Sequence, residues 1–125
     1  MFNDLIGLRY GWGKRPGDES GQTDCFQLMC EARIRLGLSD YRERFQWVYD
    51  EYTESSLPPG RILRWVIDSG MRCGSRVGAV LVLPGIRAGA LATATDSGVL
   101  LIGPSGAVIH TPGVLTKVRS YWLRP

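Results

Sequence analysis

The feature that most constrains the fold is a change of pattern near residue 70, from helical periodicity to short β-prone runs. Turn signals such as Pro84-Gly85, Asp96-Ser97 and Pro112-Gly113 separate these runs. The expected strands cover residues 77–83, 88–95, 98–102, 107–111 and 114–118. Because such short turns join antiparallel neighbours, the pattern predicts an antiparallel meander.

The first half of the chain shows the apolar spacing of three helices. The first is expected to begin at Cys25 after an N-cap at Asp24, and to end before Gly37. The second and third are expected over residues 41–52 and 61–69. Helices followed by strands, without alternation, predict an α+β fold in which the helix that begins at Cys25 packs on one face of the sheet.

Length, charge and cysteine content suggest a single domain that is synthesised in a reducing cytosol. A chain of 125 residues suits a single domain over residues 1–125. It has no apolar run of bilayer length and no signal-peptide pattern, so we expect synthesis in the cytoplasm and no membrane partner. The odd set Cys25, Cys30 and Cys73 gives no disulfide framework. A net charge of +3 with scattered arginines gives no reason to expect a nucleic-acid partner.

The position of Cys25 makes it a candidate nucleophile. In the first turn of a helix, unpaired backbone N–H groups and the helix macrodipole favour thiolate over thiol, so the pKa of Cys25 is expected to be lowered. The same residue lies on the apolar stripe that faces a core, where free cysteines are often small buried hydrophobes. The local pattern leaves both interpretations open.

Four motifs in order then invite comparison with a family. These are Tyr10-x-Trp12-Gly13, Asp24-Cys25 at a helix start, the run Gly78-Ala79-Val80-Leu81-Val82, and Gly103 followed by Val108-Ile109-His110. With them the chain resembles the NlpC-type cell-wall cysteine endopeptidases. That resemblance implies a minimal papain-like fold that hydrolyses peptidoglycan stem peptides through an acyl-enzyme, with no metal or other cofactor. Phe26 and Tyr121-Trp122 look more like the versions encoded near bacteriophage tail genes.

The resemblance implies roles for individual residues. Cys25 matches the nucleophile, Asp24 an acidic residue that helps bind the substrate amine, and Tyr10 a tyrosine that lines the substrate groove. Asp24 can equally be an N-cap, and Tyr10 a packed aromatic in a Gly-rich turn.

The family uses a histidine base and often a second histidine that orients it, whereas this chain has one histidine. The family pattern sets His110 at the orienting position and leaves Ser97, or Asp96 after a one-residue shift, at the base position. Since expelling an amine requires a proton donor, the missing base decides between functions.

Two functions therefore remain from the sequence. In one, the protein is a cysteine hydrolase in which Cys25 attacks and His110 moves the proton, with Asp96 or Ser97 orienting the ring. A base supplied by another chain is a further possibility for which the sequence offers no evidence. In the other, it is an inactive member of the fold that serves as a structural or assembly protein, for example among phage tail or virion proteins.

Two further patterns carry less weight. The chain has enough ligands for a Cys₃His zinc site in Cys25, Cys30, Cys73 and His110. However, Cys25 and Cys30 are five residues apart on one helix, unlike the Cys-x-x-Cys loops of structural zinc sites. Residues 119–124 suit an exposed docking strip less well than a terminal strand that packs its aromatic side chains.

Overall fold

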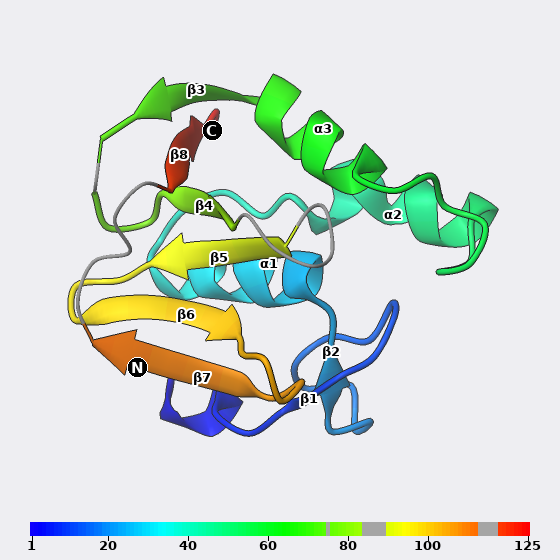
Figure 1. Cartoon of the computed structure of the whole chain (residues 1–125), viewed down its shortest axis with the longest axis horizontal. Coiled ribbons are helices and arrows are strands. Elements are labelled where there is room, and N and C mark those ends of the chain that lie inside the picture. The colour runs from blue at the N-terminus through cyan, green and yellow to red at the C-terminus, as the bar shows by residue number, and fades with distance from the viewer. Residues whose placement is uncertain (75, 84–89, 113–117) are drawn as a thin grey trace.

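A computed structural model describes residues 1–74, 76–83, 90–112 and 118–125 of the chain. Its helices are η1 (Asn3–Leu5, 3-10), α1 (Cys25–Arg35), α2 (Arg42–Glu51) and α3 (Arg61–Asp68). Its strands are β1 (Arg9–Tyr10), β2 (Gln22–Thr23), β3 (Gly70–Cys73), β4 (Val80–Leu83), β5 (Ala90–Ala94), β6 (Gly98–Ile102), β7 (Val108–Pro112) and β8 (Arg119–Leu123). Figure 1 shows helices beside a sheet, which confirms the predicted α+β class.

The main sheet is antiparallel and has the strand order β3-β8-β4-β5-β6-β7. Strands β4 to β7 follow one another as the predicted meander. At the other side the prediction is wrong, because β8 inserts between β3 and β4 instead of extending the meander. Of the last predicted strand, residues 114–118, only Val118 lies within the described residues, and it is outside any strand.

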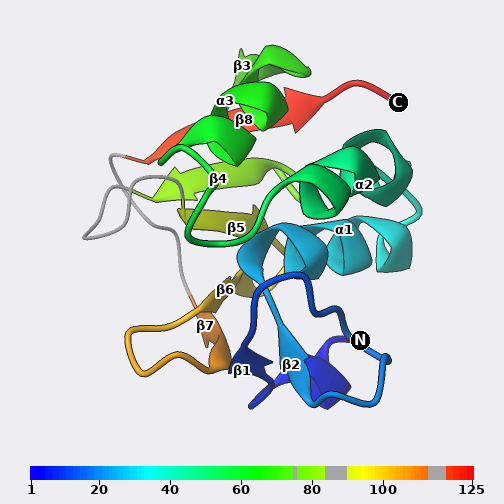
Figure 2. The same ribbon diagram turned by 90° about the vertical axis from the view of Figure 1, so that its right-hand side faces the viewer.

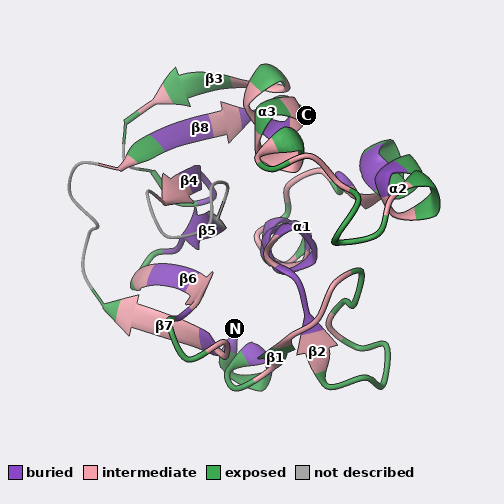
Figure 3. Cartoon of the chain, turned by 45° about the vertical axis from the view of Figure 1, so that its right-hand side comes forward, coloured by how far each residue is buried: buried purple, intermediate pink, exposed green. Residues whose placement is uncertain are grey.

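The α-helices gather on one side of the main sheet, as Figure 2 shows. Helix α1 lies between the sheet and the rest of the chain, and Figure 3 shows it as largely buried. Its apolar stripe meets side chains from β4, β5 and β8 in the central core. The buried members of this core are Phe26, Met29, Cys30, Tyr41, Phe45, Val48, Val66, Val80, Leu91 and Leu123.

The N-terminal segment extends the β7 edge of the sheet. The N–H of Gly7 donates to the carbonyl of Val108, and the N–H of Val108 donates to the carbonyl of Leu8. Phe2 and Leu5 pack with residues of α1, β6 and β7 in a second buried cluster. The short strands β1 and β2 pair in parallel, and β2 leads directly into α1. The Gly-rich segment between them therefore lies at the N-terminus of α1.

Across the described residues, each helix is too short or too polar to cross a lipid bilayer.

Candidate functional site

Cys25 occupies the helix start that the sequence predicts. It is the first residue of α1, and Asp24 is the N-cap, with extended backbone angles. One carboxylate oxygen of Asp24 accepts a hydrogen bond of 2.8 Å from the N–H of Gln27. This bond satisfies one of the N–H groups that a helix leaves unpaired at its first turn.

Asp24 also joins three parts of the chain. Its second oxygen accepts hydrogen bonds from the N–H of Gly13, at 3.0 Å, and from the hydroxyl of Tyr49, at 2.7 Å. The residue is only 3% exposed. Burial raises the pKa of the Asp24 carboxyl, while its hydrogen bonds act in the opposite direction. Both oxygens are thus engaged by the protein, which is the N-cap role; the substrate-binding role stays a prediction.

The Cys25 thiol lies in an apolar environment. The residue is half-buried, and its side chain packs at the edge of the central core. Burial raises the pKa of the thiol to about 11, the nearby Asp24 charge adds to the rise, and the N–H of Leu91 on β5 opposes it. The expectation of a lowered thiol pKa is therefore wrong, because removal of water outweighs the helix terminus. At neutral pH Cys25 is a thiol.

His110 lies on β7 and is engaged with other groups. Its Nε2 is 2.7 Å from the hydroxyl oxygen of Thr95, a residue that follows β5. The ring of Phe2 meets the imidazole edge to face, with ring centres 5.9 Å apart. The ring is thus held by contacts that do not include the thiol.

Strand register separates His110 from Cys25. Leu91, which meets the thiol, is two residues from Thr93 on β5. Thr93 pairs with Leu100 on β6, and Leu100 pairs with His110 on β7. Two strand spacings and two residue rises put the Cα atoms of Leu91 and His110 about 12 Å apart. Because the imidazole is bonded to Thr95, about 13 Å further along β5 from Leu91, it points away from the thiol.

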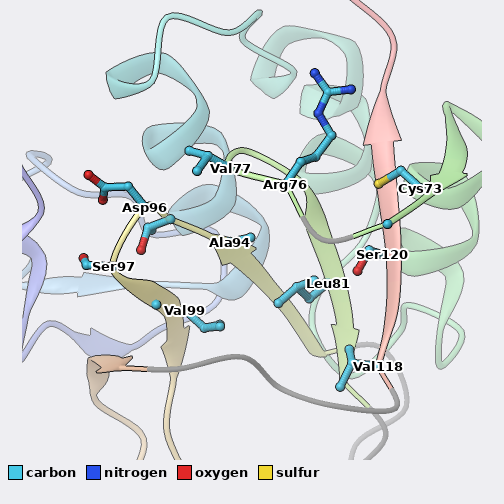
Figure 4. A pocket seen from close by; sticks show the side chains of 13 residues that line it. Cys73, Arg76, Val77, Leu81, Ala94, Asp96, Ser97, Val99, Val118 and Ser120 are labelled. Carbon is cyan, nitrogen blue, oxygen red and sulfur yellow. The ribbon is translucent and has the colours of Figure 1, made fainter.

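Asp96 and Ser97 form the turn between β5 and β6 and are exposed. This turn is at the far end of β5 from the Cys25 end of α1, as Figure 1 shows. Five residue rises put Asp96 about 16 Å from Leu91 along the strand direction. Both residues line a hollow of about 550 Å³, together with Leu81, Ala94 and Val99 (Figure 4). The structure does not bring either residue to Cys25.

Tyr10 is the predicted site residue, besides Asp24, that lies near the thiol. Its hydroxyl donates to Glu54 at 3.2 Å. Burial raises the pKa of Tyr10, and the charges of Glu54, Asp24 and Cys25 add to the rise. The neighbouring Trp12 packs against Tyr49, with ring centres 5.0 Å apart. The Gly-rich segment and Tyr49 therefore meet at Asp24, next to the Cys25 end of α1.

Three residues of this environment were not singled out from the sequence as site residues. Tyr49 was expected only as a core aromatic, although a buried tyrosine hydroxyl usually finds a hydrogen-bond partner, which is a usable signal. Leu91 looks like any strand residue. Glu54 gives no signal, because 44 positions separate it from Tyr10.

Among the residues that the structure describes, no group of three or more His, Cys, Asp or Glu side chains could hold a metal ion. Comparisons with protein-family models, with curated protein sequences and with solved structures find no match to this chain.

Proposed function

We propose that this protein is a non-catalytic domain with the architecture of an NlpC-type cysteine peptidase, and that it serves as a structural or assembly component, for example in a phage tail. The observation that carries the proposal is the contact of the Cys25 thiol with a strand, β5, that carries no titratable base. The thiol faces Leu91, an aliphatic residue on β5, where a cysteine hydrolase needs a base.

The sequence around this strand supports the same conclusion. Residues 77–95, which include β4, β5 and their connection, contain no histidine, aspartate, glutamate, cysteine, lysine or tyrosine. The titratable side chain in this stretch is Arg87, and an arginine stays protonated. A base would therefore have to come from another part of the chain. Tyr10, Asp24 and Tyr49 are near enough, but their polar atoms are engaged in hydrogen bonds.

The missing base would have a large effect on rate. General acid–base catalysis contributes roughly 10²–10⁴-fold to the rate of such a reaction. A thiol pKa of about 11 adds a second loss, because only about one molecule in 10⁴ carries a thiolate at neutral pH. The two together make peptide hydrolysis at Cys25 negligible in this conformation.

The experiment measures the rate of Cys25 alkylation by iodoacetamide from about pH 5 to about pH 10, with peptide mass spectrometry to resolve each cysteine. We expect the rate to keep rising through the whole range and to be the same in His110→Ala. A plateau below about pH 8 that His110→Ala abolishes would refute the proposal and favour the cysteine hydrolase with His110 as base.

Zymography on peptidoglycan is the direct test of activity. We expect wild type and Cys25→Ala to give the same absence of clearing. Clearing by wild type that Cys25→Ala abolishes would establish the hydrolase instead.

A further inference from the structure

Strand β3 (Gly70–Cys73) is an edge of the main sheet. In the part of the chain that the structure describes, its one strand neighbour is β8, and Figure 3 shows it as the outermost strand beside β8. An edge strand carries backbone N–H and C=O groups that can pair with a strand of another molecule. We propose that β3 pairs with β3 of a second copy of this chain, antiparallel and centred on Met71, so that the sheet continues through a symmetric dimer.

The register of β3 against β8 shows which backbone groups face the edge. The N–H of Arg124 donates to the carbonyl of Ser69, so these two residues form a hydrogen-bonded pair of the antiparallel ladder. Hydrogen-bonded and non-hydrogen-bonded pairs alternate along such a ladder, so Met71 also bonds to β8. The N–H and C=O groups of Gly70 and Arg72 therefore point away from β8, towards the edge of the sheet.

A twofold axis beside Met71 uses all of these outward groups. Gly70 then lies opposite Arg72 of the second copy, and each such pair exchanges two hydrogen bonds. Met71 lies opposite its own counterpart in a non-hydrogen-bonded pair, where side chains come closest. The Met71 side chain is 65% exposed, so the dimer covers a large apolar group that the single copy leaves in water.

The two faces of the sheet divide the remaining contacts of the dimer. Arg72 pairs with Tyr121, which pairs with Val80 of the central core, so Arg72 is on the helix side of the sheet. Met71 is on the opposite face, beside its cross-strand neighbour Trp122. The dimer thus brings two methionines and two tryptophans together on the face away from the helices, where sulfur and aromatic rings attract each other.

Charge favours the register centred on Met71. Arg72 is exposed, and a like charge directly opposite it opposes strand pairing. Centring on Arg72 sets two guanidinium groups opposite each other, whereas centring on Met71 sets Arg72 opposite Gly70, which has no side chain. Asp68 ends α3 two residues before Gly70, and its side chain is 59% exposed. Arg72 of one copy therefore comes beside Asp68 of the other, with opposite charge.

This inference rests on the assembly role proposed above, to which it adds a partner, a second copy. A strand of four residues buries a small area, so we expect a weak dimer with a dissociation constant in the micromolar range or above. Such a contact gains strength when many copies are held together in one assembly.

Sedimentation velocity from about 1 µM to about 1 mM measures the dimer. Arg72→Pro removes the N–H that points to the edge and keeps the bonds to β8, and an edge strand tolerates proline at such a position. Arg72→Ala is the matched control, because it loses the same side chain and keeps the N–H. We expect Arg72→Ala to weaken the dimer a few-fold, the effect of exposed ion pairs, and Arg72→Pro to weaken it about 25-fold further, the effect of two net hydrogen bonds.

Cysteine crosslinking tests the register. Opposite residues of a non-hydrogen-bonded pair are close enough for a disulfide. With oxidised glutathione, Met71→Cys should form a covalent dimer linked between its two residues 71, at least about tenfold faster than Ile6→Cys. Ile6 is an exposed residue near the other edge of the sheet. Trypsin cleaves after Arg72, so mass spectrometry distinguishes a link at position 71 from one at Cys73.

A monomer at every concentration would overturn the dimer. Equal dissociation constants for Arg72→Ala and Arg72→Pro would also overturn it, because the N–H at the edge would then be unused. If Arg72→Pro does not fold, crosslinking decides: a rate in Met71→Cys no higher than in Ile6→Cys refutes the pairing. Clearing of peptidoglycan by wild type would refute the non-catalytic function and leave the dimer standing, so the two proposals fail separately.

Discussion

Replacement of Asp24 by alanine should be among the most destabilising single changes in this chain. The substitution leaves three donors without their acceptor: the N–H of Gln27, the N–H of Gly13 and the hydroxyl of Tyr49. The Gln27 bond is buried, so its loss costs the full desolvation of an N–H group, about 1–3 kcal/mol. The other two bonds are part-buried and can regain water, at about 1 kcal/mol each. We expect Asp24→Ala to lower the free energy of unfolding by about 3–5 kcal/mol.

Urea unfolding followed by circular dichroism measures this change, provided that the m-value stays constant. Asp24→Asn is the control, because it keeps one acceptor oxygen for the helix cap and should cost about half as much. A double-mutant cycle with Tyr49→Phe isolates one bond: the cost of removing the hydroxyl should largely vanish when Asp24 is already alanine. A loss below about 1 kcal/mol in Asp24→Ala would refute the assignment of Asp24 as the residue that joins the three segments.

Two further predictions concern sites away from the thiol. A Cβ on Gly98 would lie 1.9 Å from the carbonyl oxygen of Thr111, so Gly98→Ala should disrupt the β6–β7 hairpin and strongly lower the midpoint temperature of thermal unfolding. The control is Gly74→Ala, because a Cβ there meets nothing within 4 Å. Equal midpoints for the two variants would contradict the predicted clash. Hydrogen bonds from Arg35 hold the pKa of Asp4 at about 2. The stabilisation from this ion pair is therefore present above the ordinary carboxyl pKa and is lost as pH falls through about 2. NMR titration should show the pKa of Asp4 returning towards 3.8 in Arg35→Gln, and an unchanged pKa would exclude the ion pair in solution.

The helices could be predicted from sequence because their signals are local. The N-cap Asp24, the apolar spacing from Cys25 and the glycine after the last turn all act within one helix length. Helix α1 accordingly begins at the expected residue. The observed ends of α2 and α3 differ from the expected ends by no more than one residue, which is within the ordinary uncertainty of helix termini.

The sheet order could not be predicted in the same way. A run such as β8 shows that residues 119–123 can form a strand, but its alternation does not say which strand will be its neighbour. Strand β8 pairs with both β3 and β4, and both partners lie far from it in the sequence. Strand β3 was missed because it is an edge strand with Met71 and Arg72 exposed, so it lacks the apolar alternation that marks a strand.

In the candidate site, too, the features set by local sequence could be predicted and those set by long-range contacts could not. Placing Cys25 in the first helical turn needed only local sequence, whereas the environment of its sulfur depends on Leu91 and Tyr10, which the fold brings from distant positions. The family pattern likewise set Ser97 or Asp96 near the thiol by their order in the sequence. The structure puts these residues at the opposite end of β5, because the strand register, and not the order of motifs, fixes which residues meet.

Magnitudes explain why the position of Cys25 does not make it reactive. A helix terminus stabilises a nearby charge by about 0.3–2 kcal/mol, which lowers a thiol pKa by at most about 1.5. Full burial can raise a pKa by about 3–5, so the sign of the result depends on water and not on the helix. The same helix terminus therefore gives a thiol of raised pKa at Cys25, where the sulfur has lost water, and would give a more acidic thiol at a position where water reaches the sulfur. Reactivity at Cys25 is thus set by the removal of water from its sulfur and not by its place on the helix, and the pH dependence of Cys25 alkylation measures it directly.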